Sequence, residues 1–108
     1  MPQYIFVYIG GEHPSNPEEG QKHFGKYQQW LASMGDAVVS PAIPFKDTHT
    51  VHPDNTIQPG TTSLISGLSI IKADSMDAAL KVAQSCPFLE INGTLEISEM
   101  IDMSSKSN

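Results

Sequence analysis

One histidine and two aspartates are the residues of this chain that could carry out acid–base chemistry together. His23 lies early in a predicted helix, next to the apolar stripe of that helix. An imidazole acts as an acid or a base near neutral pH when a carboxylate or carbonyl fixes its tautomer. Asp36 and Asp47 are the candidate partners, because a strand or loop beside the helix could bring either carboxylate close. The alternative is that His23 is a surface residue on the flank of the helix.

A second group of polar side chains lies in residues 47–54, which contain two carboxylates and the histidines His49 and His52. Such side chains could bind zinc or another divalent ion, but their spacing matches no established metal motif. Long loops in compact domains tend to be functional or disordered, so the two histidines could instead contact an organic ligand. We therefore interpret His49 and His52 as ligand-binding candidates and expect no metal and no cofactor. A simply solvated loop is the alternative.

Three further side chains have both a functional and a structural interpretation. His13 follows two glycines at the end of the first predicted strand, where a ligand could approach the backbone, but no phosphate-binding pattern completes the glycines. His13 is therefore a candidate ligand contact, with a plain turn as the alternative. Trp30 lies off the apolar stripe of its helix, which favours packing at an interface. Cys86 is at a predicted helix C-terminus, where the dipole raises a thiol pKa, so we expect a core residue.

The elements that must position these candidates begin with a strand that is apolar on both faces. Residues 4–9 are all apolar or aromatic. Alternation along a strand places two sets of side chains on opposite faces, namely Tyr4, Phe6 and Tyr8, and Ile5, Val7 and Ile9. Both faces of this strand must therefore be covered.

A long helix follows the first strand. Asn16 can accept hydrogen bonds from the free amides of the first turn, and Pro17 suits the first helical position. Apolar side chains then recur at steps of three and four residues: Phe24, Tyr27, Leu31 and Met34. Gly35 is the expected terminator.

The rest of the chain alternates strands with one more helix. We predict a strand over 36–43 at a sheet edge, because two prolines interrupt it, and a long polar loop over 44–62. A strand over 64–73, a helix that starts after Asp74-Ser75 and stops at Pro87, and a half-exposed strand over 95–101 complete the order. Residues 1–103 form one domain, and residues 104–108 form a frayed tail.

The element order β-α-β-β-α-β predicts an α+β, ferredoxin-like fold, with a four-stranded antiparallel sheet and two helices on one face. The first and third strands are apolar on both sides, so the face without helices needs another surface. The simplest surface that could cover it is the same face of a second copy of the chain. We therefore expect a homodimer whose sheets pack back to back.

Composition excludes several classes of protein. The 108 residues suit one domain, and the net charge is −6 with no basic run, which argues against nucleic-acid binding and against attraction to an anionic membrane. A single cysteine forms no intrachain disulfide, and the N-terminus does not resemble a secretory signal. We expect a cytoplasmic protein.

The segment from Ser66 to Pro87 resembles the YCII-related family, also called the DGPF-domain family. It contains a glycine, a hydrophobic strand, Asp74-Ser75, an amphipathic helix and a closing Cys86-Pro87. The first strand and first helix are also similar to their family counterparts, and His23 stands where some relatives have a helix histidine. The resemblance implies a dimeric α+β barrel. The Asp-Gly-Pro-Phe signature is absent: residues 55–62 read Asn-Thr-Ile-Gln-Pro-Gly-Thr-Thr.

Together these patterns predict a pocket between the sheet and the first helix, rimmed by His13, His23 and the 44–62 loop. The pocket would bind a small organic molecule, with His23 as the acid–base group of a proton transfer, isomerisation or cleavage. The alternative is a non-catalytic accessory or interaction domain, because the resemblance also extends to relatives associated with transcription proteins.

Overall fold

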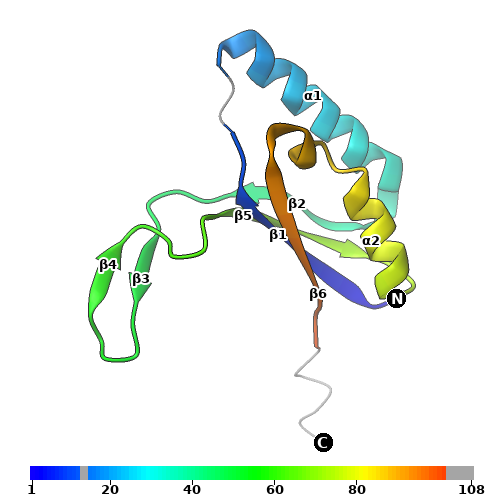
Figure 1. Cartoon of the computed structure of the whole chain (residues 1–108). Coiled ribbons are helices and arrows are strands. Elements are labelled where there is room, and N and C mark those ends of the chain that lie inside the picture. Colours follow the sequence, from blue (N-terminus) through cyan, green and yellow to red (C-terminus); the bar gives the residue numbers. More distant parts are fainter. Residues whose placement is uncertain (13–14, 102–108) are drawn as a thin grey trace, which may run out of the picture.

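The computed structural model describes residues 1–12 and 15–101, and a four-stranded antiparallel sheet forms its centre (Figure 1). The sheet has the order β2-β5-β1-β6 and consists of β1 (Gln3–Gly10), β2 (Val38–Pro44), β5 (Ile65–Lys72) and β6 (Gly93–Glu99). The second predicted strand is therefore an edge strand, as its prolines indicated. The helices α1 (Pro17–Met34) and α2 (Met76–Gln84) lie on the same face of the sheet. The predicted α+β, ferredoxin-like arrangement is confirmed.

Side-chain caps fix the starts of both helices. The Asn16 side chain accepts a hydrogen bond from the backbone N–H of Glu19 at 2.9 Å, and the Ser75 hydroxyl accepts one from the N–H of Ala78 at 3.1 Å. These bonds satisfy donors that have no partner within the first turn of a helix. Among the described residues, neither helix is long and apolar enough to cross a membrane.

The core lies between the helices and one face of the sheet. Tyr4, Phe6 and Tyr8 of β1 are at most 4% exposed, and they pack with residues of both helices. Trp30 belongs to this core, so its predicted position at an interface is wrong: it is 6% exposed. Its indole N–H lies 3.2 Å from the carbonyl oxygen of Val82, which gives a buried tryptophan the polar partner it needs.

The helix α1 is rotated relative to the predicted stripe. Phe24, which the pattern assigned to the buried side, is 62% exposed. Tyr27, Leu31 and Met34 do pack against the core, together with Trp30. The indole of Trp30 is larger than the ring of Phe24, and its N–H needs a hydrogen-bond acceptor. When this side of α1 turns toward α2, the indole enters the core and the carbonyl oxygen of Val82 supplies the acceptor.

The opposite face of the sheet carries the second apolar set of β1. Ile5, Val7 and Ile9 are partly exposed, and Ile5 and Val7 stand opposite Ile70 and Leu68 of β5. In the part of the chain that the structure describes, both helices lie on the other side (Figure 1). The prediction that β1 is apolar on two faces is confirmed, whereas β5 is apolar on the open face and carries the polar Ser69 beside Ile71 on the covered face.

The 44–62 segment is more ordered than a polar loop. It contains a two-stranded hairpin, β3 (His49–Val51) and β4 (Ile57–Pro59), which projects from the sheet (Figure 1). The tight connection includes Asn55 in the left-handed region, a conformation that asparagine tolerates well. The expectation of an irregular loop was wrong because two short β-branched runs flank this turn.

Two short 3-10 helices, η1 (Gly35–Ala37) and η2 (Pro87–Ile91), were also not expected. The first delays the start of β2 to Val38. The second follows α2, which already ends at Gln84, and it buries Phe88 against the sheet. Phe88 lies so close to Gly93 that a Cβ atom there would overlap its ring. The glycine at the start of β6 therefore makes room for this aromatic side chain.

Candidate functional site

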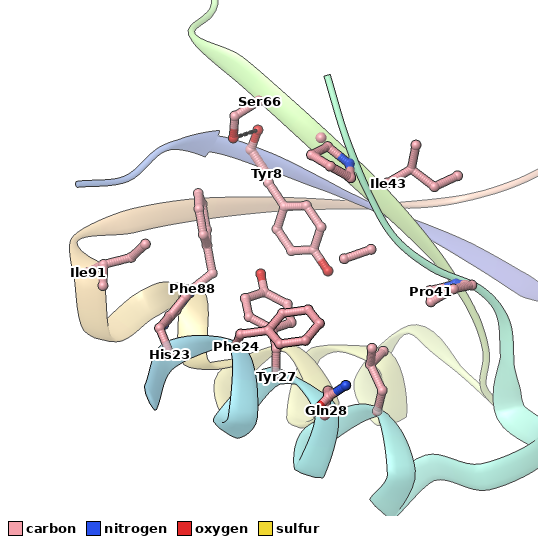
Figure 2. Close-up of a pocket in the computed structure, with 14 residues that line it drawn as sticks. Tyr8, His23, Phe24, Tyr27, Gln28, Pro41, Ile43, Ser66, Phe88 and Ile91 are labelled. Atoms are coloured by element: carbon pink, nitrogen blue, oxygen red, sulfur yellow. Dashed lines mark hydrogen bonds between the residues drawn. The ribbon is translucent and has the colours of Figure 1, made fainter. Parts of the chain in front are cut away.

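A cavity of about 500 Å³ lies between α1 and the sheet, where the sequence predicted a pocket (Figure 2). The helix supplies one wall, residues 41–44 of β2 supply another, and β1, β5 and η2 close the remaining sides. The lining residues are Tyr8, His23, Phe24, Tyr27, Gln28, Leu31, Pro41, Ala42, Ile43, Pro44, Ser66, Gly67, Phe88 and Ile91. Most of these side chains are aliphatic or aromatic, so the cavity is largely apolar.

The wall formed by β2 depends on Gly67 of β5. A Cβ atom at this position would lie 2.6 Å from the carbonyl oxygen of Ile43 and 3.3 Å from the Cα atom of Pro44. The register between the two strands also shifts on either side of Ser40, which bends the edge strand. A glycine in β5 thus lets the backbone of β2 approach and form the cavity wall.

Aromatic rings form the base of the cavity. The ring of Tyr8 makes edge contacts with Tyr27 at 5.9 Å and with Phe88 at 5.1 Å between centroids. Tyr27 in turn makes edge contacts with His23 at 5.1 Å and with Trp30 at 5.9 Å. Edge-to-face packing of this kind holds the rings in defined positions, so the base of the cavity is preformed.

The hydroxyl groups of Tyr8 and Tyr27 both lie in the space between the sheet and α1 (Figure 2), close enough to influence each other's pKa. The Tyr8 hydroxyl shares a hydrogen bond of 2.5 Å with the hydroxyl of Ser69, which is fully buried. The thiol of Cys86 donates to the Tyr27 hydroxyl at 3.7 Å. Cys86 is thus a buried residue, as predicted, and it takes part in a small polar network under the cavity.

Burial keeps these groups protonated. It raises the pKa of the Tyr8 hydroxyl and that of the Cys86 thiol above their ordinary values. The pKa of Tyr27 is raised furthest, first by burial and then by the neighbouring Tyr8 and Cys86. A phenol that keeps its proton can donate a hydrogen bond, so both tyrosines are neutral donors at physiological pH.

His23 lies at the edge of the cavity, half-buried against the ring of Tyr27. No hydrogen bond or ion pair of the described residues involves its imidazole. Asp36 is in η1, beyond the far end of α1, roughly 20 Å from His23 at 1.5 Å per helical residue. The side chain of Asp47 is near His49 at 3.7 Å. The structure does not bring His23 together with either predicted carboxylate partner.

The two loop histidines belong to the hairpin and not to the cavity lining. His49 is the first residue of β3, and its ring lies 3.2 Å from the backbone oxygen of Asp47. The ring of His52 pairs with the side-chain oxygen of Gln58 at 2.9 Å. Residues 1–12 and 15–101 contain no group of three or more possible metal ligands. His13 lies outside the described residues, as does the predicted tail at 104–108.

Reasoning from the sequence missed the two tyrosines and Ser69 as site residues. Tyr8 and Tyr27 were recognised only as members of apolar faces, and Ser69 only as part of a buried strand. A signal was present, because a hydroxyl at an inward position must find a hydrogen-bond partner. Three such hydroxyls on inward positions of β1, α1 and β5 indicate a shared polar site.

Fold and cavity together define a small α+β domain that encloses an apolar pocket under its first helix. The model of the YCII-related domain matches residues 1–104, and the chain belongs to the YCII-related family, as its resemblance indicated. No curated protein matches the chain significantly in sequence.

A solved structure with a similar fold is the 5-chloro-2-hydroxyhydroquinone dehydrochlorinase from Burkholderia phenoliruptrix, in complex with 2,5-dihydroxybenzoquinone. The TM-score is 0.58, and the match covers 92% of this chain and 93% of that chain. The sequences share 11% identity, so this likeness supports the fold alone.

Proposed function

We propose that this protein binds a small organic molecule in the cavity between α1 and the sheet. The observation that carries the proposal is a largely apolar space of about 500 Å³ whose lining includes a few polar side chains, among them the phenols of Tyr8 and Tyr27. Ligand pockets in proteins have volumes of about 300–1,000 Å³ and the same mixture of apolar walls and a few polar groups. The solved dehydrochlorinase of similar fold also holds a small organic molecule, which is consistent with this proposal.

His23 is the acid–base candidate within this function. Among the lining residues it has the side chain that ordinarily exchanges a proton near neutral pH. Because neither Asp36 nor Asp47 lies beside it, any proton transfer would depend on the imidazole and the bound molecule alone. Binding is therefore the primary function that we propose, and catalysis by His23 is its extension.

The chain has one cysteine and so forms no intrachain disulfide, which suits a reducing compartment. We therefore propose that the protein is located in the cytoplasm.

A thermal-shift screen of small aromatic and heterocyclic compounds tests the proposal. A ligand at 100 times its Kd stabilises the folded state by about 2.7 kcal/mol, which is a shift of several degrees for a domain of this size. Ala42→Leu fills part of the cavity and should abolish the shift. Val39→Leu lies on the same strand outside the cavity and is the matched control.

The proposal fails if no compound stabilises the wild type, or if each one stabilises the Ala42→Leu variant equally well. For compounds that bind, His23→Gln separates binding from catalysis. We expect the variant to keep the thermal shift and to lose any turnover. Turnover that persists in this variant would remove His23 from the chemistry.

The open face of the sheet supports a second function, self-association. Ile5, Val7, Leu68 and Ile70 form a connected apolar surface on strands that pair with one another. We propose that the same face of a second copy covers it, as an isologous contact allows. Size-exclusion chromatography with light scattering should give twice the chain mass of 11.7 kDa.

Val7→Lys should reduce this mass to that of one chain, because it places a charge at the centre of the open face. Gln29→Lys adds the same charge on the outer side of α1 and should leave the dimer intact. Circular dichroism must show that both variants are folded. A wild-type particle of single-chain mass at high concentration would rule out the dimer.

A further inference from the structure

The polar atoms deepest in the cavity belong to two tyrosines from different elements. Tyr8 is on β1 and Tyr27 is on α1, and their neighbouring hydroxyl groups lie in the space between the two elements (Figure 2). The side chains around them, such as Leu31, Ile43 and Phe88, present carbon atoms. A ligand that enters the cavity therefore meets apolar walls first and a pair of phenols at the base.

The hydrogen bonds of these phenols are only partly used. A phenol donates one hydrogen bond and can also accept. Tyr27 accepts from Cys86, and its hydroxyl also lies close to that of Tyr8, a contact that contributes to the raised pKa of Tyr27. A ligand oxygen between the two phenols would replace this contact. Tyr8 and Ser69 share one bond, whichever of the two donates, so one further hydroxyl hydrogen remains in that pair. The base of the cavity thus has both donors and acceptors to offer to a ligand oxygen.

The same surroundings disfavour a charged ligand. In the described part of the chain, His23 at the edge of the cavity is the one basic side chain in its lining, which includes no lysine or arginine. Burial also keeps both phenols and the Cys86 thiol protonated, as their raised pKa values indicate. Moving a carboxylate from water into an apolar site without a paired cation is costly. The cavity should therefore discriminate strongly between neutral and anionic molecules.

We infer that the Tyr8–Tyr27 hydroxyl pair selects a neutral ring compound whose hydroxyl or carbonyl oxygen lies between the two phenols. The inference rests on the proposed function, because it concerns the ligand of the same cavity. The edges and faces of Tyr27, Phe88 and His23 favour a flat ring. The phenols supply the hydrogen bonds that an oxygen on that ring loses when it leaves water.

Three small probes separate the contributions of ring, oxygen and charge. p-Cresol carries a neutral hydroxyl, toluene lacks the oxygen, and p-toluate carries a charged carboxylate on the same ring. Titration calorimetry gives each Kd, and the fluorescence of Trp30, the only tryptophan, reports binding independently because its ring contacts Tyr27. We expect p-cresol to bind about tenfold more tightly than toluene, a ratio that one hydrogen bond supplies. p-Toluate should bind most weakly.

Tyrosine-to-phenylalanine variants assign this preference to its residues. Tyr8→Phe and Tyr27→Phe each remove one hydroxyl and keep the ring, so the ratio between p-cresol and toluene should fall toward one. Tyr4→Phe is the matched control, because Tyr4 is buried on the same face of β1 but does not line the cavity. It should leave the ratio unchanged. Tyr27→Phe tests the inference by itself if loss of the Ser69 partner unfolds the Tyr8 variant.

The outcomes distinguish this inference from the proposed function. If toluene binds as tightly as p-cresol, the cavity is a binding site but the hydroxyl pair does not select its ligand. Tightest binding of p-toluate would overturn the inference in the same way. If none of the three probes binds the wild type, the inference is also wrong, and the proposed function then depends on the outcome of the wider compound screen.

Discussion

The two faces of β1 show how one strand serves two purposes. On the helix side, Tyr4, Phe6 and Tyr8 are buried and pack against both helices. On the other side, the aliphatic residues Ile5, Val7 and Ile9 remain partly exposed. The first face is complete within one chain, whereas the second is apolar surface without a cover in the described residues. The covered face therefore stabilises the fold of the single chain, and the open face is available to a partner.

The faces also differ in where polar atoms are placed. On the covered face, the hydroxyls of Tyr8 and Ser69 are buried beside a cavity. On the open face, the middle of β1 and β5 is aliphatic, and polar side chains surround it, with Gln3 opposite Lys72 at the strand ends and Glu96 of β6 opposite Val7. Buried hydroxyls can bind and orient a ligand, and an aliphatic surface can only associate. We therefore propose ligand binding for the covered face and assembly for the open one.

The sharpest test of this comparison uses two adjacent residues. Phe6→Ala should lower the free energy of unfolding by about 3–5 kcal/mol, because it removes a fully buried ring from the core. Val7→Ala, on the open face, should cost about 1 kcal/mol in a dilute sample where the chain is monomeric. Urea unfolding followed by circular dichroism measures both values. Equal losses at the two positions would mean that both faces are core.

A pair of glycines tests the cavity wall on the covered side. Gly67→Ala places a Cβ atom against the backbone of β2 and should cost about 1–3 kcal/mol, because the edge strand must move. Gly25→Ala is the control. This glycine is inside α1 with open space around its Cα, so alanine should stabilise the protein by about 0.5–1 kcal/mol. The close approach of β2 would be refuted if both alanines stabilised.

Stability at high pH tests the buried phenols. Burial raises the pKa of Tyr27 above its unfolded value of 10.0, so the unfolded chain releases this proton first as the pH rises. The stabilisation is fully present below pH 10 and is lost above it, by at most about 1.4 kcal/mol per pH unit for each such group. Tyr8 acts in the same direction, and Cys86 begins to do so above pH 9.0.

Tyr27→Phe should therefore make the loss of stability above pH 10 shallower than in the wild type. Burial also raises the pKa of Tyr4, so Tyr4→Phe should change the slope in the same direction but by no more than Tyr27→Phe, because the pKa of Tyr27 is raised further. Denaturant unfolding between pH 7 and pH 11 measures the slopes. Identical slopes for the wild type and the Tyr27 variant would show that Tyr27 ionises equally easily in both states.

Local patterns were sufficient to predict the fold. The alternation along β1, the caps at Asn16 and Ser75 and the prolines of β2 each act through neighbouring residues, so they can be recognised in the sequence. A pocket between the first helix and the sheet was also predicted, and of its expected rim His23 and Pro44 line the cavity.

The composition of the site could be predicted only in part. His23 was expected at the cavity and lines it, whereas its predicted partners Asp36 and Asp47 lie elsewhere. Which carboxylate approaches a histidine depends on tertiary packing, and sequence separation gives no measure of that distance. The rotation of α1 shows the same limit, since the need of Trp30 for a partner overrides the simple periodicity that favoured Phe24.

The hairpin that was predicted as a loop supplies the smallest expected effect. Val51 and Ile57 stand opposite each other across β3 and β4 and are 66% and 69% exposed. An exposed pair that belongs to neither face of the sheet contributes little to the core, so Ile57→Thr should change the free energy of unfolding by no more than about 0.5 kcal/mol. Unfolding should be measured at low and at high protein concentration. A larger loss that appears only at high concentration would show that a second copy covers the hairpin, and the apolar surface available for assembly would then extend beyond the open face of β1.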